Sequence, residues 1–324
     1  MRILYHPAVL RHDPGPTHPE RQERITAFGV LEVTEPEAFE TIEEELHRVH
    51  QRAYIEHVKR ACALSLALDG DTQTSPNSYE AALVAVAMTL RALADGHFAL
   101  VRPPGHHAYA AQGRGFCLFN NVAVAAQKAV DAGKRVLILD FDGHLGDGTM
   151  DIFYRNPQVL YWSLHQYPAY PGNGSPLEIG EGAGRGFTIN CPLPPQSGDD
   201  ILQHAVEYML PIVEQFQPDI VAVSAGFDAH WSDPLLQLRA TNHFYYWIGQ
   251  VLRRTFSRQQ IFAALEGGYN TDELPNCVYN FIAGINGESP AAIEQPSTSS
   301  RRVWEMYEMY LHQASAVLSK HWKL

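Results

Sequence analysis

The sequence predicts an α/β fold in which one mainly parallel, multi-stranded sheet carries helices on both faces. Short apolar runs alternate along the chain with longer stretches that have helical spacing, as expected for repeated strand–helix units. Residues 136–139 and 220–223 are apolar at every position, which is typical of strands buried on both faces of a parallel sheet. We therefore expect right-handed βαβ units that build one open sheet.

Seven short apolar runs are expected to form the strands. In chain order they are residues 3–5, 98–102, 135–141, 159–164, 187–190, 220–224 and 261–265. Three helices are expected between them, at residues 78–94, 120–132 and 199–215. The first helix ends before Asp95-Gly96 and the second ends at Gly133. The third begins with Asp199-Asp200, whose negative charge suits a helix N-terminus.

The C-terminal part of the chain predicts a loop followed by one more helix. Residues 285–302 are rich in Gly, Ser, Pro and Thr, and the helix is expected at about 303–318. Composition does not change along the chain, so residues 1–324 are expected to form a single domain on which this last helix packs. The sequence does not predict the oligomeric state.

Composition excludes several classes of protein. Hydrophobic residues make up 45%, which is ordinary for a globular chain, and no apolar run approaches the roughly 18 residues of a membrane helix. The net charge is −12 and no basic run is present, so we expect no nucleic-acid partner. Four cysteines without CxxC spacing, and a polar N-terminus where a secretory signal needs an apolar run, favour the cytoplasm.

Polar residues collect after the expected strands, at the sheet edge where ligands bind in α/β folds. After residue 139 come Asp140, Asp142 and His144, spaced by two, so on extended backbone they face one way. Such groups at the end of a buried strand are costly unless they are paired or bound to a metal. Asp and His suit Zn²⁺ and other first-row divalent ions, and a hydrogen-bonded turn is the alternative.

Three further strand ends carry candidate residues. His106 and His107 follow Pro-Pro-Gly, whose irregular backbone lets adjacent histidines converge, although two unrelated surface histidines are equally compatible. Asp228 could be a further ligand or a helix cap. Tyr269 follows two glycines that let backbone approach a site, although a core tyrosine is the ordinary alternative. Four such loops in one sheet point to a common site.

Together these segments resemble the zinc-dependent histone deacetylase and acetylpolyamine amidohydrolase family, which has the arginase/deacetylase fold. The resemblance spans nearly the whole chain. Its motifs are His18-Pro19-Glu20-Arg21, the segments 49–54 and 71–82, Arg102-Pro103-Pro104-Gly105-His106-His107-Ala108, Gly115-Phe116-Cys117, residues 140–148, residues 163–166, residues 224–230 and Glu266-Gly267-Gly268-Tyr269.

The resemblance implies roles for individual residues. The zinc ligands would be Asp142, His144 and Asp228. Asp140 would orient His106, Asp147 would orient His107, and Tyr269 would be the catalytic tyrosine. The substrate channel would be lined by Gly115, Phe116, Tyr170 and Leu235. Structural potassium would be held at one site by Asp140, Asp142, His144, Ser163 and Leu164, and at a second site by carbonyls near Phe153, Asn156, Val159 and Phe187.

The implied reaction is hydrolysis of an N-acyl amide by metal-activated water. His107 would be the general base and would then protonate the leaving amine, and Tyr269 would donate to the oxyanion. One departure from the family pattern is Leu145, where a second His usually follows the ligand His. This position is not a ligand, so we expect the chemistry to survive the change.

The substrate is expected to be an acyl-lysine peptide or protein, with an acetylpolyamine as the alternative. Leu235 stands where one type of polyamine-selective relative has a Glu, and residues 66–73 lack the long insertion of dimeric polyamine enzymes. Longer acyl groups and other small acetylated amides stay open. So do a non-catalytic acyl-lysine binder, a two-manganese ureohydrolase, and Fe²⁺ or Co²⁺ in place of zinc.

Overall fold

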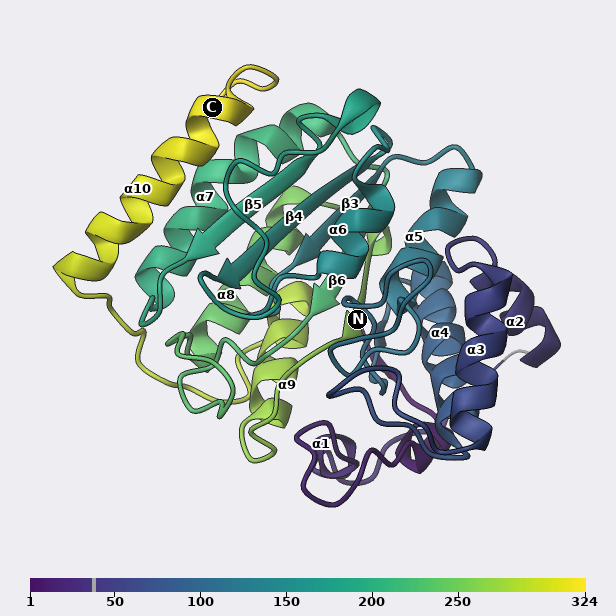
Figure 1. Ribbon diagram of the computed structural model, residues 1–324. Helices are drawn as coiled ribbons and strands as arrows, with labels where there is room; N and C mark the ends of the chain where they lie inside the picture. Colours follow the sequence, from purple (N-terminus) through teal and green to yellow (C-terminus); the bar gives the residue numbers. More distant parts are fainter. Residues whose placement is uncertain (37–38) are drawn as a thin grey trace.

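Seven parallel strands form one sheet in the order β1-β2-β7-β6-β3-β4-β5 (Figure 1). The computed structural model describes residues 1–36 and 39–324. The strands are β1 (Ile3–Leu4), β2 (Phe98–Ala99), β3 (Val136–Asp140), β4 (Val159–Gln166), β5 (Thr188–Leu193), β6 (Ile220–Ala225) and β7 (Ile261–Leu265). Every residue of β3 and β7 is buried, as expected for central strands of a parallel sheet. The predicted fold class is confirmed.

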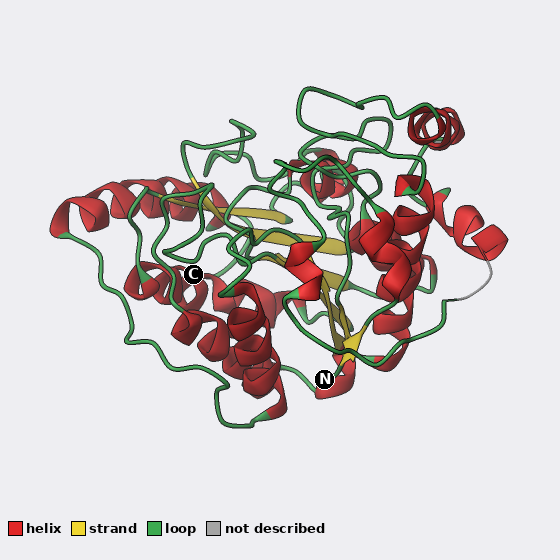
Figure 2. Ribbon diagram, turned by 90° about the horizontal axis from the view of Figure 1, so that it is seen from below, coloured by secondary structure: helices red, strands yellow, loops and turns green. Residues whose placement is uncertain are grey.

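Helices cover both faces of the sheet, and the direction of each crossover decides which face a helix takes (Figure 2). The connections through α4, α5 and α6 lead one way across the sheet, whereas those through α7 and α8 lead back and place these helices on the opposite face. The helices are α1 (Glu23–Thr26), α2 (Phe39–Leu46), α3 (Arg52–Ala63), α4 (Ser78–Asp95), α5 (Asn121–Asp131), α6 (Asp147–Phe153), α7 (Asp199–Phe216), α8 (Asn242–Thr255), α9 (Leu274–Asn286) and α10 (Arg301–Leu318).

Several boundaries differ from the sequence prediction. The strand expected at 98–102 is only two residues long. Its neighbour β1 pairs with it at two residues only, and the chain turns away from the sheet at Pro103. The strand expected at 187–190 continues to Leu193 beside β4. The loop expected at 285–302 is shorter, since α9 reaches Asn286 and α10 begins at Arg301. The helices α1, α2, α3, α6, α8 and α9 were not predicted from the sequence.

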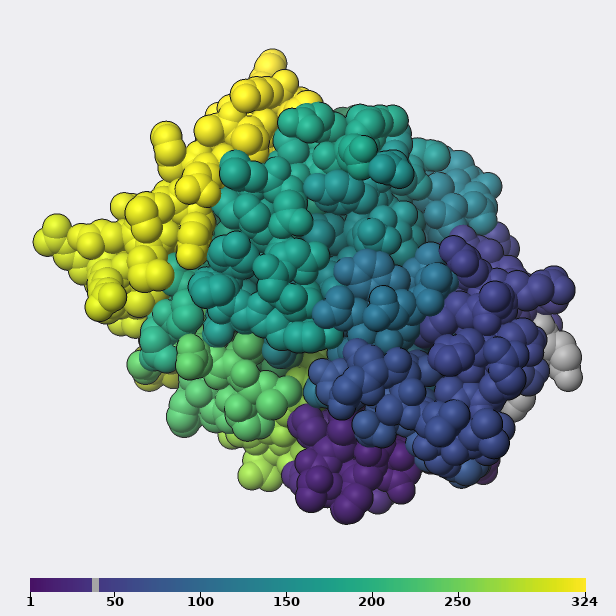
Figure 3. All heavy atoms as spheres, in the orientation of Figure 1, coloured from purple at the N-terminus to yellow at the C-terminus, as the bar shows by residue number. Residues whose placement is uncertain are grey.

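The C-terminal helix α10 packs along the outer edge of the sheet, against β5 and α7. Its buried side chains are Val303, Tyr307, Ala314 and Leu318. In Figure 3 the C-terminal residues form a ridge on the outside of the molecule. Among residues 1–36 and 39–324, no helix is both long enough and apolar enough to cross a membrane.

The order of the strands creates one position where crossovers lead away in opposite directions. From β3 the chain continues to β4 on one side, whereas from its neighbour β6 it continues to β7 on the other. Loops that leave the carboxyl ends of two such strands diverge and leave a crevice between them, where open α/β sheets bind ligands. The loops after β3 and β6 carry the candidate metal ligands.

Candidate metal centre and active site

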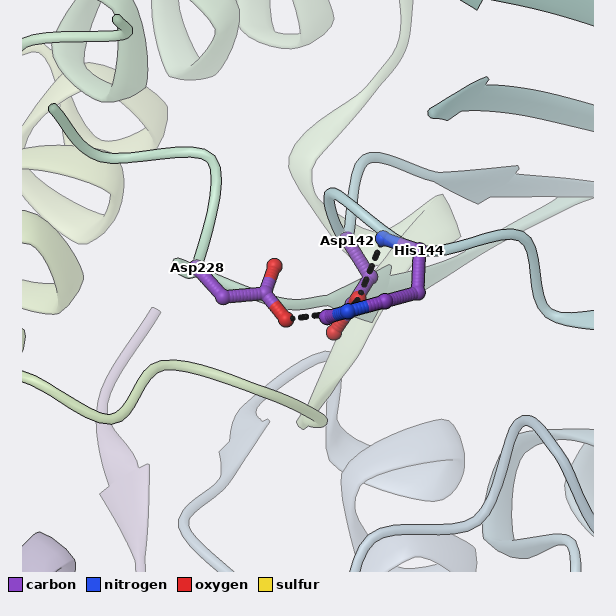
Figure 4. A group of neighbouring side chains, drawn as sticks. All are labelled: Asp142, His144 and Asp228. Carbon is purple, nitrogen blue, oxygen red and sulfur yellow. Dashed lines mark hydrogen bonds and ion pairs between the residues drawn. The ribbon is translucent and has the colours of Figure 1, made fainter. Parts of the chain in front are cut away.

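Three side chains converge between the ends of β3 and β6 (Figure 4). They are Asp142 and His144 from the loop after β3 and Asp228 from the loop after β6, and one donor atom of each lies within 4.8 Å of the others. His144 Nδ1 lies 2.8 Å from Asp228 Oδ2 and 3.3 Å from Asp142 Oδ1. Two carboxylates and one imidazole are a suitable donor set for a divalent first-row metal ion.

Backbone amides and glycines hold the two carboxylates in place. Asp142 Oδ2 accepts from the amide of Gly267 at 2.7 Å, and Asp228 Oδ1 accepts from the amide of Gly143 at 2.6 Å. A Cβ at Gly226 would lie 1.9 Å from Asp142 Oδ2, and one at Gly267 would lie 2.4 Å from Asp228 Oδ2. The sequence therefore needs glycine at both positions, because a side chain there would displace a ligand.

The electrostatics of this cluster favour a cation. Asp142 and Asp228 are fully buried, where two carboxylates repel each other strongly unless positive charge lies between them. Burial lowers the pKa of His144, but the carboxylates of Asp228 and Asp142 outweigh burial and raise the pKa to about 10. The negative charge that attracts a proton to Nδ1 would attract a metal ion to the same point. The residues present therefore fit the metal that the family resemblance implies.

Beside the metal cluster lie two aspartate–histidine pairs. His106 Nδ1 is 3.1 Å from Asp140 Oδ2, and His107 Nδ1 is 2.6 Å from Asp147 Oδ1. The two imidazole rings lie 4.1 Å apart between centroids. Asp140 also accepts from the Tyr161 hydroxyl at 3.0 Å. In each pair the carboxylate fixes the orientation of the ring. Nε2 of His106 then lies 3.8 Å from Asp142 Oδ1.

The two histidines differ in charge. Burial lowers the pKa of His106, but the carboxylates of Asp142 and Asp140 outweigh burial and raise the pKa well above its ordinary value. Burial and the neighbouring charge of His106 lower the pKa of His107 to about 4, against the opposing effect of Asp147. The surroundings therefore favour the protonated form of His106 and the neutral form of His107, whose Nε2 can then accept a proton.

The loop after β7 places Tyr269 across the cavity from the histidines. Its backbone amide donates to Asp233 Oδ2 at 2.7 Å, and the Arg24 guanidinium lies 4.9 Å from the centre of its ring. Burial raises the pKa of Tyr269 well above its ordinary value despite Arg24, so the hydroxyl stays protonated and can donate. In the same loop, Glu266 Oε2 accepts from the amides of Gly105 and His106.

One cavity of about 230 Å³ brings these groups together. It is lined by His107, His144 and Tyr269 and by the four expected channel residues, Gly115, Phe116, Tyr170 and Leu235, together with Asp71. Phe116 lies edge-on to Tyr269 at 5.8 Å between ring centroids, and Tyr170 lies edge-on to His107 at 5.1 Å. The cavity therefore has aromatic walls and a polar end.

Asp140 does not lie where the spacing argument placed it. We expected Asp140, Asp142 and His144 to face one way on extended backbone, but β3 ends at Asp140. The amide of Asp142 donates to Asp140 Oδ1 and the amide of His144 donates to Asp142 Oδ1, so the chain turns twice. Asp140 consequently faces His106 rather than the metal cluster, which is the place that the family resemblance implies.

The residues expected to hold potassium lie close together, although their carbonyls also serve the backbone. Asp140 and Ser163 are direct neighbours across β3 and β4, next to Leu164, and Ser163 Oγ lies 2.9 Å from His165 Nδ1. Carbonyls of the second expected site already accept backbone amides. The Phe153 carbonyl accepts from Asn156 and the Asn156 carbonyl from Val159, in the turn before β4. The Phe187 carbonyl accepts from Tyr161 of β4.

Sequence reasoning missed several residues of the site. Asp71 lines the cavity, Arg114 and Tyr109 contact Asp147, and Asp233 holds Tyr269. Only Tyr161 had a readable signal, because it alternates with Ser163 and His165 on one face of β4. Leu145, the departure from the family pattern, is fully buried and lies next to Gly174 rather than among the metal ligands.

Comparison with known proteins shows the family of the chain. The histone deacetylase domain profile matches residues 16–285. The chain is 34% identical to a protein named probable deacetylase from Archaeoglobus fulgidus, over 99% of this chain and 98% of the relative. It is 36% identical to the histone deacetylase-like amidohydrolase of Pseudomonas aeruginosa, over 80% of this chain and 74% of the relative.

A solved structure supports the same relationship. The crystal structure of the HDA15 HD domain superposes with a TM-score of 0.88 at 31% sequence identity, and the match covers 99% of this chain and 94% of that one. The profile match, the two relatives and this superposition lead to one conclusion. The chain belongs to the histone deacetylase family and is a deacetylase-type hydrolase.

Proposed function

We propose that this protein removes the acyl group from an acyl-lysine side chain, with a zinc ion held by Asp142, His144 and Asp228. The observation that carries the proposal is the cavity in which His144, His107 and Tyr269 meet, with the aromatic rings of Phe116 and Tyr170 in its lining. An extended, uncharged acyl-lysine stem fits between two aromatic rings, whereas a compact ligand would not use both walls.

Each group then has a chemical task. When bound, the metal polarises the amide carbonyl and acidifies the attacking water. His107 takes the proton of that water on Nε2 and returns it to the leaving amine, because it is neutral and held by Asp147. His106 contributes positive charge, and the Tyr269 hydroxyl donates to the carbonyl oxygen as negative charge develops there.

The rim of the cavity supports an acyl-lysine substrate, and one residue favours the polyamine alternative. Leu235 adds an exposed apolar side chain, which suits a peptide more than a second ammonium group. Asp71 also lines the cavity, and a carboxylate at this place can accept from a peptide N–H or attract the free amine of an acetylpolyamine. Acetylpolyamine is therefore kept as the second candidate.

The deciding experiment is acetate release by the zinc-loaded protein from an acetyl-lysine peptide, N-acetylputrescine and N-acetylspermidine in parallel. Asp71→Asn separates the two candidates, because it should weaken polyamine turnover far more than peptide turnover. Turnover of the peptide alone supports the proposal, and preference for polyamines would replace it by the second candidate. Absence of acetate in every case, with zinc bound, would overturn acetyl as the acyl group and point to a different acyl group or to a non-catalytic acyl-lysine binder.

Three further expectations belong with this proposal. Potassium would stabilise the loops around Ser163 and Asn156, as the family resemblance implies. A reducing compartment such as the cytoplasm would suit the four cysteines, all of which are free and buried. The chain would act as one domain with one metal ion, since within residues 1–36 and 39–324 a single cluster of this kind is found. That count argues against a two-manganese ureohydrolase.

A further inference from the structure

The two aspartate–histidine pairs share two kinds of partner and differ in one cationic side chain. Each carboxylate holds a histidine and accepts from a tyrosine, Tyr161 for Asp140 and Tyr109 for Asp147. Asp147 has in addition an arginine, because Arg114 Nη1 lies 3.4 Å from its Oδ2. Within the part of the chain that the structure describes, Asp140 has no such cation. The additional arginine therefore belongs to the Asp147–His107 pair, which contains the proposed general base.

Arg114 also reaches the wall of the channel. Its Nε donates to the hydroxyl of Tyr170 at 3.0 Å, and its guanidinium carbon lies 5.2 Å from the centre of the Tyr170 ring. Tyr170 in turn packs edge-on against His107. One guanidinium therefore joins the carboxylate behind the base to the aromatic ring in front of it. Three quarters of its side chain is shielded from solvent, so these contacts are only partly screened.

The backbone around Arg114 is fitted to the same histidine. Gly115 and Phe116 both have positive φ, at 55° and 68°, and such a conformation is strained for Phe. A Cβ at Gly115 would lie 2.5 Å from His107 Cδ2, so the turn packs directly on the imidazole. The amide of Cys117 donates to the Arg114 carbonyl at 2.9 Å and closes the turn. The position of Arg114 is therefore fixed at its backbone as well as at its guanidinium.

We propose that Arg114 is a positioning residue that locks the channel wall at Tyr170 to the Asp147–His107 pair. This inference rests on the proposed function. Two contacts make two separable contributions. The contact with Asp147 keeps the carboxylate charged and directed at His107, which affects the rate of the chemical step. The contact with Tyr170 holds the ring upright along the acyl-lysine stem, which affects substrate binding.

Steady-state kinetics of four variants separate these contributions. Arg114→Met should lower kcat about tenfold, the loss expected for one charge-assisted hydrogen bond, and should also raise KM. Tyr170→Phe should raise KM by the same factor as Arg114→Met, and the double variant should raise it no further, because both remove the same bond. Arg114→Lys should recover kcat but not KM, since an ammonium group cannot fork to both partners. Arg91→Met, an exposed arginine on α4, is the matched control.

Three kinetic outcomes would overturn the proposal. The first is an Arg114→Met variant with unchanged kcat and KM. The second is an Arg114→Lys variant whose kcat is as low as that of Arg114→Met. The third is a double variant whose increase in KM equals the product of the increases in Arg114→Met and Tyr170→Phe. A general folding defect would not give the expected result. It would not let Arg114→Lys recover kcat while KM stays as high as in Arg114→Met.

A second measurement decides the question without turnover. The short His107–Asp147 hydrogen bond should give a downfield proton resonance, identified by its absence in His107→Ala. Arg114→Met should shift this resonance and Arg91→Met should not. An unmoved resonance would overturn the proposal even in an active enzyme. If the wild type and Arg91→Met turn over no substrate while the resonance shifts in Arg114→Met, the proposed function fails and the positioning role stands.

Discussion

At the scale of single residues, the metal ligands depend on backbone that leaves no room for a side chain. Gly226 is the tightest case, because any Cβ there would overlap the Asp142 carboxylate. The neighbouring ligand loops cannot absorb this displacement, since Asp142 is also tied to the amides of His144 and Gly267. The geometry of the site therefore depends on the glycines beside the carboxylates as much as on the carboxylates themselves.

Gly226→Ala should therefore weaken metal binding without unfolding the protein. We expect a loss of about 10–100-fold in zinc affinity, the range found when groups that orient metal ligands are removed. Competition with a chelator of known affinity measures it. Gly70→Ala is the control, because a Cβ at Gly70 meets no atom within 4 Å. Equal zinc affinity in the two variants would contradict the argument.

Tyr269→Phe should separate catalysis from metal binding. Loss of one donor to an oxyanion costs about 10²–10³ in rate, and we expect that loss in kcat with zinc content unchanged. Acetate release and metal analysis of the same preparation measure both. Near-full activity in this variant would remove Tyr269 from the reaction.

The sequence predicts the identity of the site residues better than their partners. Asp142, His144 and Asp228 are predicted from their places after strands and from the family motifs, and the structure brings them together because strand ends in a parallel sheet meet at one edge. Arg114 could not be found this way, and Asp71 opens the motif segment 71–82 without any sign of its place in the cavity. Both lie on irregular loops, where side-chain direction depends on turns such as the one at Gly115 and Phe116.

At the scale of elements, one buried carboxylate ties the N-terminal segments to the active-site loops. Glu20 accepts two bonds of 2.8 Å from Arg102, which follows β2, and one of 3.1 Å from Arg24 in α1. Arg24 also donates to the carbonyl of Gly268, next to Tyr269. All three charged side chains are fully buried, so their pairing is obligatory.

Glu20→Gln should destabilise the protein by about 3–5 kcal/mol at pH 7, because it leaves buried arginines without their counter-charge. Burial opposes the charge of Glu20, but Arg102, His12 and Arg24 hold its pKa well below the ordinary 4.5. A lowered folded-state pKa contributes stability above the unfolded value, and this contribution is lost as pH falls. The difference from wild type in urea denaturation should therefore be constant near neutral pH and shrink below about pH 4.5.

Glu308→Gln is the control for that comparison, since Glu308 is exposed on α10. A difference between wild type and Glu20→Gln that grows in acid would contradict the assignment of the charge.

Strands were easier to predict than helices. Residues 261–265 match β7 at both ends because a fully buried central strand is a bare apolar run. The helix α8 was missed, since Phe244, Tyr245, Tyr246 and Trp247 favour strands intrinsically. The signals for a helix were the Thr241 N-cap and the helical spacing of the apolar residues that follow it.

At the scale of the whole molecule, α10 completes the far edge of the sheet outside the region that matches the family profile. Tyr307 is its main anchor, fully buried and hydrogen-bonded to His204 at 3.0 Å. The helix covers β5, which would otherwise present an open edge to other chains. Its contribution should be to stability, because the metal cluster lies between β3 and β6.

Tyr307→Ala should lower the free energy of unfolding by about 3–5 kcal/mol while kcat/KM stays unchanged at 25 °C. Urea denaturation and acetate release measure the two quantities. Met309→Ala, which truncates an exposed side chain of the same helix, should change neither. Lost activity in folded Tyr307→Ala would show that α10 acts on the site.

The strand order also sets the moment at which the metal can bind during synthesis. His144 and Asp228 are 84 residues apart, and the amide of Gly267 that holds Asp142 is 125 residues away from it. A growing chain that has not yet reached β6 offers two donors and no glycine cradle. An ion that needs all three donors would therefore be captured only after β6 has inserted beside β3. A bound ion would then mark a chain whose central strands are already in place.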